Sequence, residues 1–269
     1  MRNQTRVCNC IAFHNFNYAD INWRAWHEYC LSIFAKHNVI PNQVLVRGLH
    51  YGNSSKPKGL KAGLNKLEKF NFEGIEALDY SLKEEGAEDV DNVIMSIYIS
   101  SRTKNPHSSK AVFCIDEKLE PFIQSNFEDL AAGFFNAAKV RYGYYYNRML
   151  KDDASSYMFG GHISYLNPEE KRRFKIWSHA FIHEKYKTGD LRDIYKLNFL
   201  SREHLVRDIR HTDQQSSSTP ITLESLINSS PVHGELKQLR EGFWSWYVPD
   251  EYIESVRNAL IPSGIILCV

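Results

Sequence analysis

The chain has 269 residues, of which 43% are hydrophobic and 24% are charged, and its formal net charge is +1. This length allows one large domain or two small ones, and the near-neutral charge gives no long-range attraction to nucleic acid or to an anionic membrane. No run approaches the roughly 18–20 apolar residues that span a bilayer, and the first residues lack the pattern of a secretory signal.

The N-terminal part of the chain is predicted to contain two strands separated by a helix. Residues 7–13 and 44–49 have the apolar character of strands. The helix between them is expected to start after Asp20 as its capping residue and to end near Asn38. Its apolar stripe consists of Trp23, Trp26, Cys30, Ile33 and Phe34. Residues 51–61 are predicted to form an exposed loop, because they are rich in Gly, Ser, Lys and Pro. Their glycines and lysines do not fit a phosphate-binding pattern.

The next part of the chain is predicted to form a helix, a hairpin and a second helix. Residues 72–83 are expected to be helical. Their spacing places three apolar residues on one face: Ile75, Leu78 and Leu82. Residues 93–100 and 111–115 are predicted to pair as a hairpin. Residues 120–139 then keep the apolar period of an amphipathic helix.

A dense run of tyrosines occupies the segment Arg141–Met149. Each phenol hydroxyl needs a polar partner, so the run is predicted to be a strand with alternate rings in the core and the others at a surface. Stacking of nucleic-acid bases is an alternative use of such rings when Arg and Lys are interleaved. Only Arg141 and Arg148 flank this run, which argues against nucleic acid.

Residues 157–163 are predicted to form a strand with a glycine bend, and a helix is expected to follow. Asn167 and Pro168 provide the cap and the first position of that helix. Its apolar stripe is Phe174, Trp177 and Phe181. His179 and His183 share another face at a spacing of four, but no glutamate lies between them, so no metal is expected there.

The segment Leu191–Leu205 interleaves apolar, charged and amide side chains. Its first ten residues are expected to be irregular or extended, resting on a core while Arg192, Asp193 and Asn198 point outward. If Arg192 and Asp193 were buried instead, they would fix geometry more than they would add stability. Ser201 is expected to cap a short helix after them.

The polar run 211–220 is predicted to be a mobile surface loop, and it is where the chain would divide if it had two parts. Four elements are predicted beyond it: a helix over 223–227, a strand over 243–248, a helix over 252–260 and a strand over 265–269. The last three would form a right-handed crossover within one sheet. Together these elements predict a single α+β domain over residues 1–269, with mixed, largely antiparallel sheet layers packed against amphipathic helices.

The sequence contains no recognisable catalytic motif. No serine lies in a G-x-S-x-G elbow, and Cys30 and Cys114 fall within predicted core elements, where cysteines pack. Five cysteines, an odd number without framework spacing, indicate reduced thiols in a cytoplasmic protein. No catalytic residue and no cofactor are therefore predicted, and the question of an enzyme stays open.

Several short motifs resemble bacterial immunity-type proteins. They are Tyr142-Gly143-Tyr144, Gly160-Gly161, Leu191-Arg192-Asp193-Ile194-Tyr195, Asn198-Phe199-Leu200-Ser201, His204-Leu205 and Trp244-Ser245-Trp246-Tyr247-Val248. Over roughly residues 120–269 the chain is similar to cytoplasmic α+β families that include immunity protein 52 and the type VI secretion immunity family. It departs from many such inhibitors in being nearly neutral where they are acidic.

The resemblance implies a non-catalytic protein that binds a cognate protein toxin and occludes its active site. Our hypothesis is that the aromatic run and the segment around Arg192 supply the contacts, namely Tyr144, Tyr145, Tyr146, Arg148, Arg192, Asp193 and Asn198. Two alternatives stay open. One is an enzyme acting on a small anionic or nucleotide-like ligand through Arg141, Arg148, Arg192 and a histidine, and the other is a structural protein that forms homo-oligomers.

Overall fold

The computed structural model describes residues 6–54, 56–84, 93–102, 105–149, 156–159, 168–177, 182–210 and 221–267. Within these residues, ten strands form one sheet in the order β3-β2-β4-β5-β6-β1-β7-β8-β10-β9, and all neighbouring strands are antiparallel. The strands are β1 (Val7–His14), β2 (Gln43–Gly48), β3 (Lys58–Gly59), β4 (Ile75–Lys83), β5 (Val93–Arg102), β6 (Asn105–Asp116), β7 (Tyr142–Met149), β8 (Leu197–Ser201), β9 (Glu235–Arg240) and β10 (Phe243–Tyr247). The predicted α+β class with a largely antiparallel sheet is confirmed.

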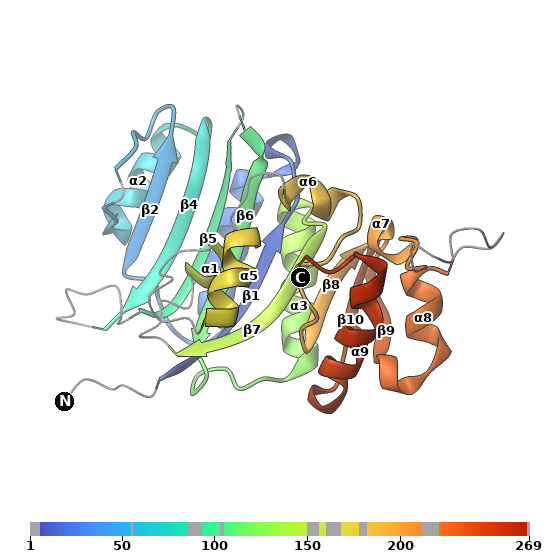
Figure 1. Cartoon of the computed structure of the whole chain (residues 1–269). Coiled ribbons are helices and arrows are strands. Elements are labelled where there is room, and N and C mark those ends of the chain that lie inside the picture. Colours follow the sequence, from blue (N-terminus) through green and yellow to red (C-terminus); the bar gives the residue numbers. More distant parts are fainter. Residues whose placement is uncertain are drawn as a thin grey trace.

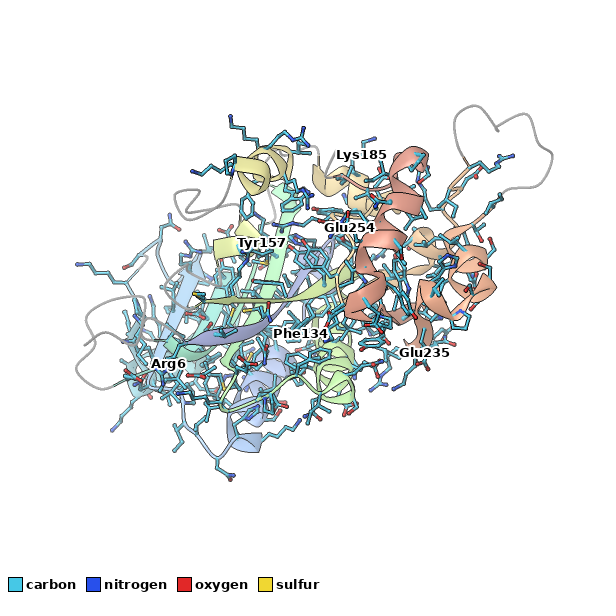
Figure 2. All side chains as sticks on the ribbon, turned by 60° about the horizontal axis from the view of Figure 1, so that its bottom comes forward. Arg6, Phe134, Tyr157, Lys185, Glu235 and Glu254 are labelled. Carbon is cyan, nitrogen blue, oxygen red and sulfur yellow. The ribbon has the colours of Figure 1, made fainter. Side chains whose placement is uncertain are left out.

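Helices cover both faces of this sheet (Figure 1). One face packs against α1 (Trp23–Lys36), α2 (Leu60–Lys69) and α3 (Gln124–Ala138). The other face packs against α5 (Pro168–Trp177), α6 (Ile182–Lys187), α7 (Arg202–Leu205), α8 (Leu223–Ser229) and α9 (Ile253–Leu260), with the short α4 (Ser156–Phe159) on the same side. Figure 2 shows the two layers edge-on, with Phe134 of α3 below the sheet and Tyr157 of α4 above it.

Strand β1 lies in the middle of the sheet, between β6 and β7, and it is buried on both faces. Ile11 and Phe13 contribute to the core under α1 and α3, whereas Cys8, Cys10 and Ala12 contribute to the core on the opposite side. This double burial explains why residues 7–13 form a nearly continuous apolar run.

Two expectations for the N-terminal half are wrong. The side chain of Asn22 caps α1 by accepting a hydrogen bond from the Ala25 N–H, while Asp20 belongs to a preceding 3-10 turn. Residues 75–83 form strand β4 and not a helix. Ile75, Leu78 and Leu82 fit helical spacing, but Tyr80 packs into the same core, because β4 pairs with β2 and β5 and places alternate residues on one face.

Three further expectations need correction. The predicted loop 51–61 contains β3 and the start of α2, and β9 was not predicted. Residues 156–159 form a turn of helix where a strand was expected. Ile266 makes a single parallel bridge to Leu191 outside the sheet, so the predicted last strand and its crossover are absent from the described residues. The predicted loop 211–220 lies outside the described residues.

No helix of the described residues is long and apolar enough to cross a membrane.

Candidate functional site

The tyrosine run forms strand β7, and both of its faces are buried. Tyr142, Tyr144 and Tyr146 point into the core beneath α4 and α5, while Tyr145 joins the core on the α1 and α3 side. None of the four is more than 5% exposed, so the expectation that alternate rings lie at a surface is wrong. Gly143 stands among them because a Cβ there would come within 2.5 Å of the Ala12 carbonyl oxygen on the neighbouring strand.

Arg192 is enclosed by aromatic rings and is only 1% exposed. It lies in the segment between α6 and β8, which follows the face of the sheet above β7. Its guanidinium carbon is 4.1 to 5.5 Å from the centroids of four rings, those of Trp177, Tyr157, Tyr144 and Phe174. Rings at such distances stabilise a cation through their electron-rich faces, most strongly when water is excluded.

Hydrogen bonds hold Arg192 within these rings. Its guanidinium donates to the Tyr144 hydroxyl and, at 3.0 Å, to the carbonyl oxygen of Tyr157, and its backbone N–H donates to the Tyr142 hydroxyl at 2.6 Å. Burial opposes the charge of Arg192, but the tyrosine oxygens around it, Tyr144 first, keep its pKa above the ordinary value. Arg192 therefore ties α4 and α5 to β7 as a buried cation and does not point outward as expected.

Asp193 is buried next to Arg192 and bridges two cations. One carboxylate oxygen accepts a hydrogen bond from Arg257 of α9 at 2.7 Å and another from the Ile194 N–H at 2.8 Å. The other oxygen lies 3.3 Å from a guanidinium nitrogen of Arg173 on α5. Through this one carboxylate, helices α5 and α9 are joined to the segment that precedes β8.

Asn198 is fully buried at the start of β8, so it also does not point outward as expected. Its side-chain oxygen accepts a hydrogen bond from the Tyr195 N–H at 3.1 Å, and its side-chain nitrogen donates to the Tyr195 carbonyl oxygen at 2.6 Å. This closed pair of hydrogen bonds fixes the turn at Tyr195. The Tyr195 ring in turn stacks on Tyr144, with centroids 4.3 Å apart and planes 14° apart.

A cleft of about 550 Å³ opens on the outer side of these residues. Its aromatic wall is formed by Phe122, Tyr145, Tyr146, Tyr157 and Tyr195. Its charged wall is formed by Glu117, Arg148, Arg173, Asp193, Lys196, Asp250 and Arg257. Lys196 pairs with Asp250 at 2.6 Å, and the Arg148 guanidinium stacks on Tyr157 at 4.4 Å from the ring centroid. The cleft lining therefore contains charges of both signs, with one cation paired to a carboxylate and another stacked on an aromatic ring.

The seven residues implicated from the sequence divide into two groups. Tyr145, Tyr146, Arg148 and Asp193 line the cleft. Tyr144, Arg192 and Asn198 lie behind its wall. Lys196 belongs to the segment around Arg192 that was already implicated. No local pattern pointed to Arg173, Asp250 and Arg257, because they come from separate elements that only the fold brings together.

The residues proposed for an enzyme do not converge. Arg141 pairs with Glu203 at the surface, at 3.7 Å, and Arg192 is buried behind the cleft wall, which leaves Arg148 as the arginine of that set in the cleft lining. Of the two histidines, His179 lies outside the described residues, as does the side chain of His183. Among the described residues no group of three or more His, Cys, Asp and Glu side chains has the geometry of a metal site.

His204 of α7 is a buried histidine that packs against the tyrosines of β7. It stacks on Tyr142 with planes 13° apart, and its Nδ1 lies 2.9 Å from the hydroxyl of Ser201, the N-cap residue of α7 as predicted. Its Nε2 has no hydrogen-bond partner among the described residues. Burial lowers the pKa of His204 to about 4, so the ring is neutral in the folded protein at neutral pH.

This histidine is expected to make the protein less stable in acid. A histidine in the unfolded chain titrates near pH 6.5. Between about pH 6.5 and pH 4, His204 is therefore protonated in the unfolded chain but neutral in the folded protein. Stability is therefore lost as the pH falls through this window, by about 2 kcal/mol between pH 7 and pH 5. Urea unfolding at the two pH values should show a smaller loss for His204→Asn, whose amide oxygen can replace Nδ1. An equal loss in both proteins would contradict the assignment.

These observations define a class of protein: an α+β fold on one antiparallel sheet, with an open, aromatic and ion-paired cleft beside β7. No family model matches the chain, and neither does any curated protein. Among solved structures, the T6SS protein PA0821 of Pseudomonas aeruginosa is similar to this chain, with a TM-score of 0.55 and 12% sequence identity. The match covers 97% of this chain and 73% of that protein. At this identity the similarity shows a shared fold.

A second solved structure matches a smaller part of the chain. It is the toxic C-terminal tip of CdiA from Pseudomonas aeruginosa in complex with immune protein. The match covers 52% of this chain and 86% of the other, with 8% identity and a TM-score of 0.22.

Proposed function

We propose that this protein is a non-catalytic, cytoplasmic binding protein that recognises a cognate protein toxin through the cleft beside β7 and so blocks the toxin's action. The observation that carries the proposal is the composition of the cleft wall, where tyrosines and arginines from β7, α4, α5 and α9 face one opening. Tyrosine and arginine are the residue types that most often dominate the binding energy of protein interfaces.

The charge of the cleft also supports a protein partner. Four cationic side chains, Arg148, Arg173, Lys196 and Arg257, stand against three carboxylates, Glu117, Asp193 and Asp250. A polyanion such as nucleic acid would meet repulsion from the carboxylates, whereas the mixed polar surface of a protein can pair with both signs. The motifs that resemble immunity-type proteins lie in the same part of the chain, and the fold shared with a T6SS protein is consistent with the proposal.

The cleft is held in a fixed shape before any partner arrives. Asp193 is locked by Arg173, Arg257 and the Ile194 N–H, and Tyr195 is locked by Asn198. Side chains that are already ordered lose less conformational entropy on association, so a larger share of the contact energy appears as affinity.

The test compares capture and neutralisation by the wild type and two charge variants. Tagged wild-type protein is used to recover a stoichiometric partner from the native host, and the purified partner is titrated against each variant. Arg148→Glu, in the cleft, is expected to weaken binding roughly 10- to 100-fold and to abolish protection of cells that co-express the partner. Arg202→Glu, on the exposed surface of α7, is the matched control and should bind like the wild type.

Two results would overturn the proposal. Equal affinity of the partner for the wild type and Arg148→Glu would exclude the cleft as the binding site. Turnover of a metabolite or nucleic acid by the purified protein, abolished by one substitution in the cleft, would show that the protein is an enzyme.

A further inference from the structure

Three buried thiols gather on one face of the sheet, where the proposed binding function does not use them. Cys8 and Cys10 lie on β1 and Cys114 lies on the neighbouring strand β6, and all three belong to the core beneath α4 and α5. They are 1%, 0% and 5% exposed. The Sγ atoms of Cys10 and Cys114 are 3.1 Å apart.

The register of the two strands selects one pair from these three thiols. Cys10 lies directly opposite Cys114, whereas Cys8 lies opposite Asp116. Directly opposed residues of antiparallel strands have Cα atoms about 4.5–5.5 Å apart, which is within the roughly 4.4–6.8 Å that a disulfide requires. The diagonal from Cys8 to Cys114 spans about 7–8 Å, and two residues along one strand are separated by nearly 7 Å, so the other pairings exceed or barely reach the limit.

We propose that Cys10 and Cys114 are a redox pair that closes to a cross-strand disulfide when the folded protein meets a peroxide. One thiolate attacks hydrogen peroxide and becomes a sulfenic acid with release of hydroxide, which takes up the proton that the thiol lost. The second thiol then attacks the sulfenic sulfur, forms the S–S bond and releases water. In sum, two thiols lose two electrons and two protons, and one peroxide is reduced to two waters.

The surroundings of Cys10 and Cys114 determine how fast the disulfide forms and how it affects stability. Burial raises the pKa of the Cys10 thiol well above its usual range, so the thiolate is scarce and the reaction is slow at neutral pH and faster in alkali. Once formed, the bond joins residues that are 104 positions apart in the chain. Closing so long a loop restricts the unfolded chain strongly, so oxidation should raise resistance to unfolding.

The pair is tested by oxidising the folded, full-length protein with hydrogen peroxide. Alkylation in denaturant and intact-mass measurement should then show a loss of two mass units and two thiols protected from the alkylating reagent. Peptide mapping without reductant should join the segment that contains Cys10 to the segment that contains Cys114. The oxidised protein should also unfold at a higher urea concentration than the reduced protein, and dithiothreitol should reverse the shift.

Three variants make the test specific. Cys8→Ser and Cys30→Ser should retain the two-unit loss, because they leave the opposed pair intact. Cys114→Ser should lose it, with its near-ultraviolet circular dichroism checked for a native fold. A cross-link between any other cysteines in the folded wild type, or none under conditions that oxidise the same chain in urea, would overturn the assignment. Both of these outcomes are measured on the wild type alone, so the test remains decisive even if Cys114→Ser fails to fold.

Discussion

Replacing Arg192 by alanine is expected to lower the free energy of unfolding by about 3–5 kcal/mol. The substitution removes a fully buried side chain from among four rings and leaves a cavity between β7, α4 and α5. It also leaves the Tyr144 hydroxyl and the carbonyl oxygen of Tyr157 without the guanidinium that donates to them. The Tyr144 hydroxyl keeps His14 as a hydrogen-bond partner at 3.2 Å, so the lost hydrogen bonds add to the cost of the lost packing mainly at Tyr157.

Two further variants separate these contributions. Arg192→Met retains most of the volume but makes no hydrogen bond, so it should lose less stability than Arg192→Ala. Arg202→Ala removes an exposed arginine that pairs with Glu224 at 2.9 Å on the surface, and its effect should stay below about 1 kcal/mol. Urea unfolding followed by tryptophan fluorescence suits the comparison, because Trp177 contacts Arg192. If Arg192→Ala and Arg202→Ala lost similar amounts, Arg192 would not hold the layers together.

Replacing Asp193 by alanine is the second change with a large expected effect. The Asp193 side chain is 6% exposed and pairs with Arg173 and Arg257, so its loss removes a shared anionic partner from two partly buried cations. The expected loss of stability is about 2–4 kcal/mol, because the substitution breaks both of these ion pairs and leaves the Ile194 N–H without its acceptor. Asp193→Asn keeps the acceptor for the Ile194 N–H, so its loss should be smaller.

Asp193→Ala should also alter the cleft, because Arg173, Arg257 and Asp193 all line it. The control is Asp250→Ala, which removes a cleft carboxylate that is 66% exposed and pairs with Lys196, and which should cost less than about 1 kcal/mol. Chemical denaturation of the wild type, Asp193→Ala and Asp250→Ala measures the free energy of unfolding that each substitution removes. A loss at Asp193 no larger than that at Asp250 would mean that the buried pairs do not stabilise the fold.

The fold class could be predicted from the sequence because local patterns carry it. The apolar periods of residues 23–34 and 120–139 predicted α1 and α3, and the alternation over 93–100 and 111–115 predicted the β5–β6 hairpin. The local pattern was ambiguous at β4: Leu78, Tyr80 and Leu82 alternate with polar residues as in a strand, but Ile75, Leu78 and Leu82 also fit the spacing of a helix.

The candidate site could be predicted only in part. The tyrosine run and the pair Arg192 and Asp193 stood out as unusual, and the structure brings them together. Their orientation could not be predicted, because a charged residue followed by apolar ones fits both an exposed segment and a buried cation among rings. Arg173 and Arg257 are 84 residues apart in the chain, so nothing local connects either of them to Asp193.

The sequence by itself therefore determined the secondary structure of the strongly periodic segments, the α+β class and the aromatic richness of β7, since each follows from neighbours in the chain. The tertiary structure alone decided that Arg192 is enclosed by aromatic rings, that Cys10 faces Cys114, and that a cleft opens between α4, α5 and α9. These features depend on strand register and helix docking. Both are set by contacts between residues far apart in the chain, and hydrophobic period does not encode which distant side chains will meet.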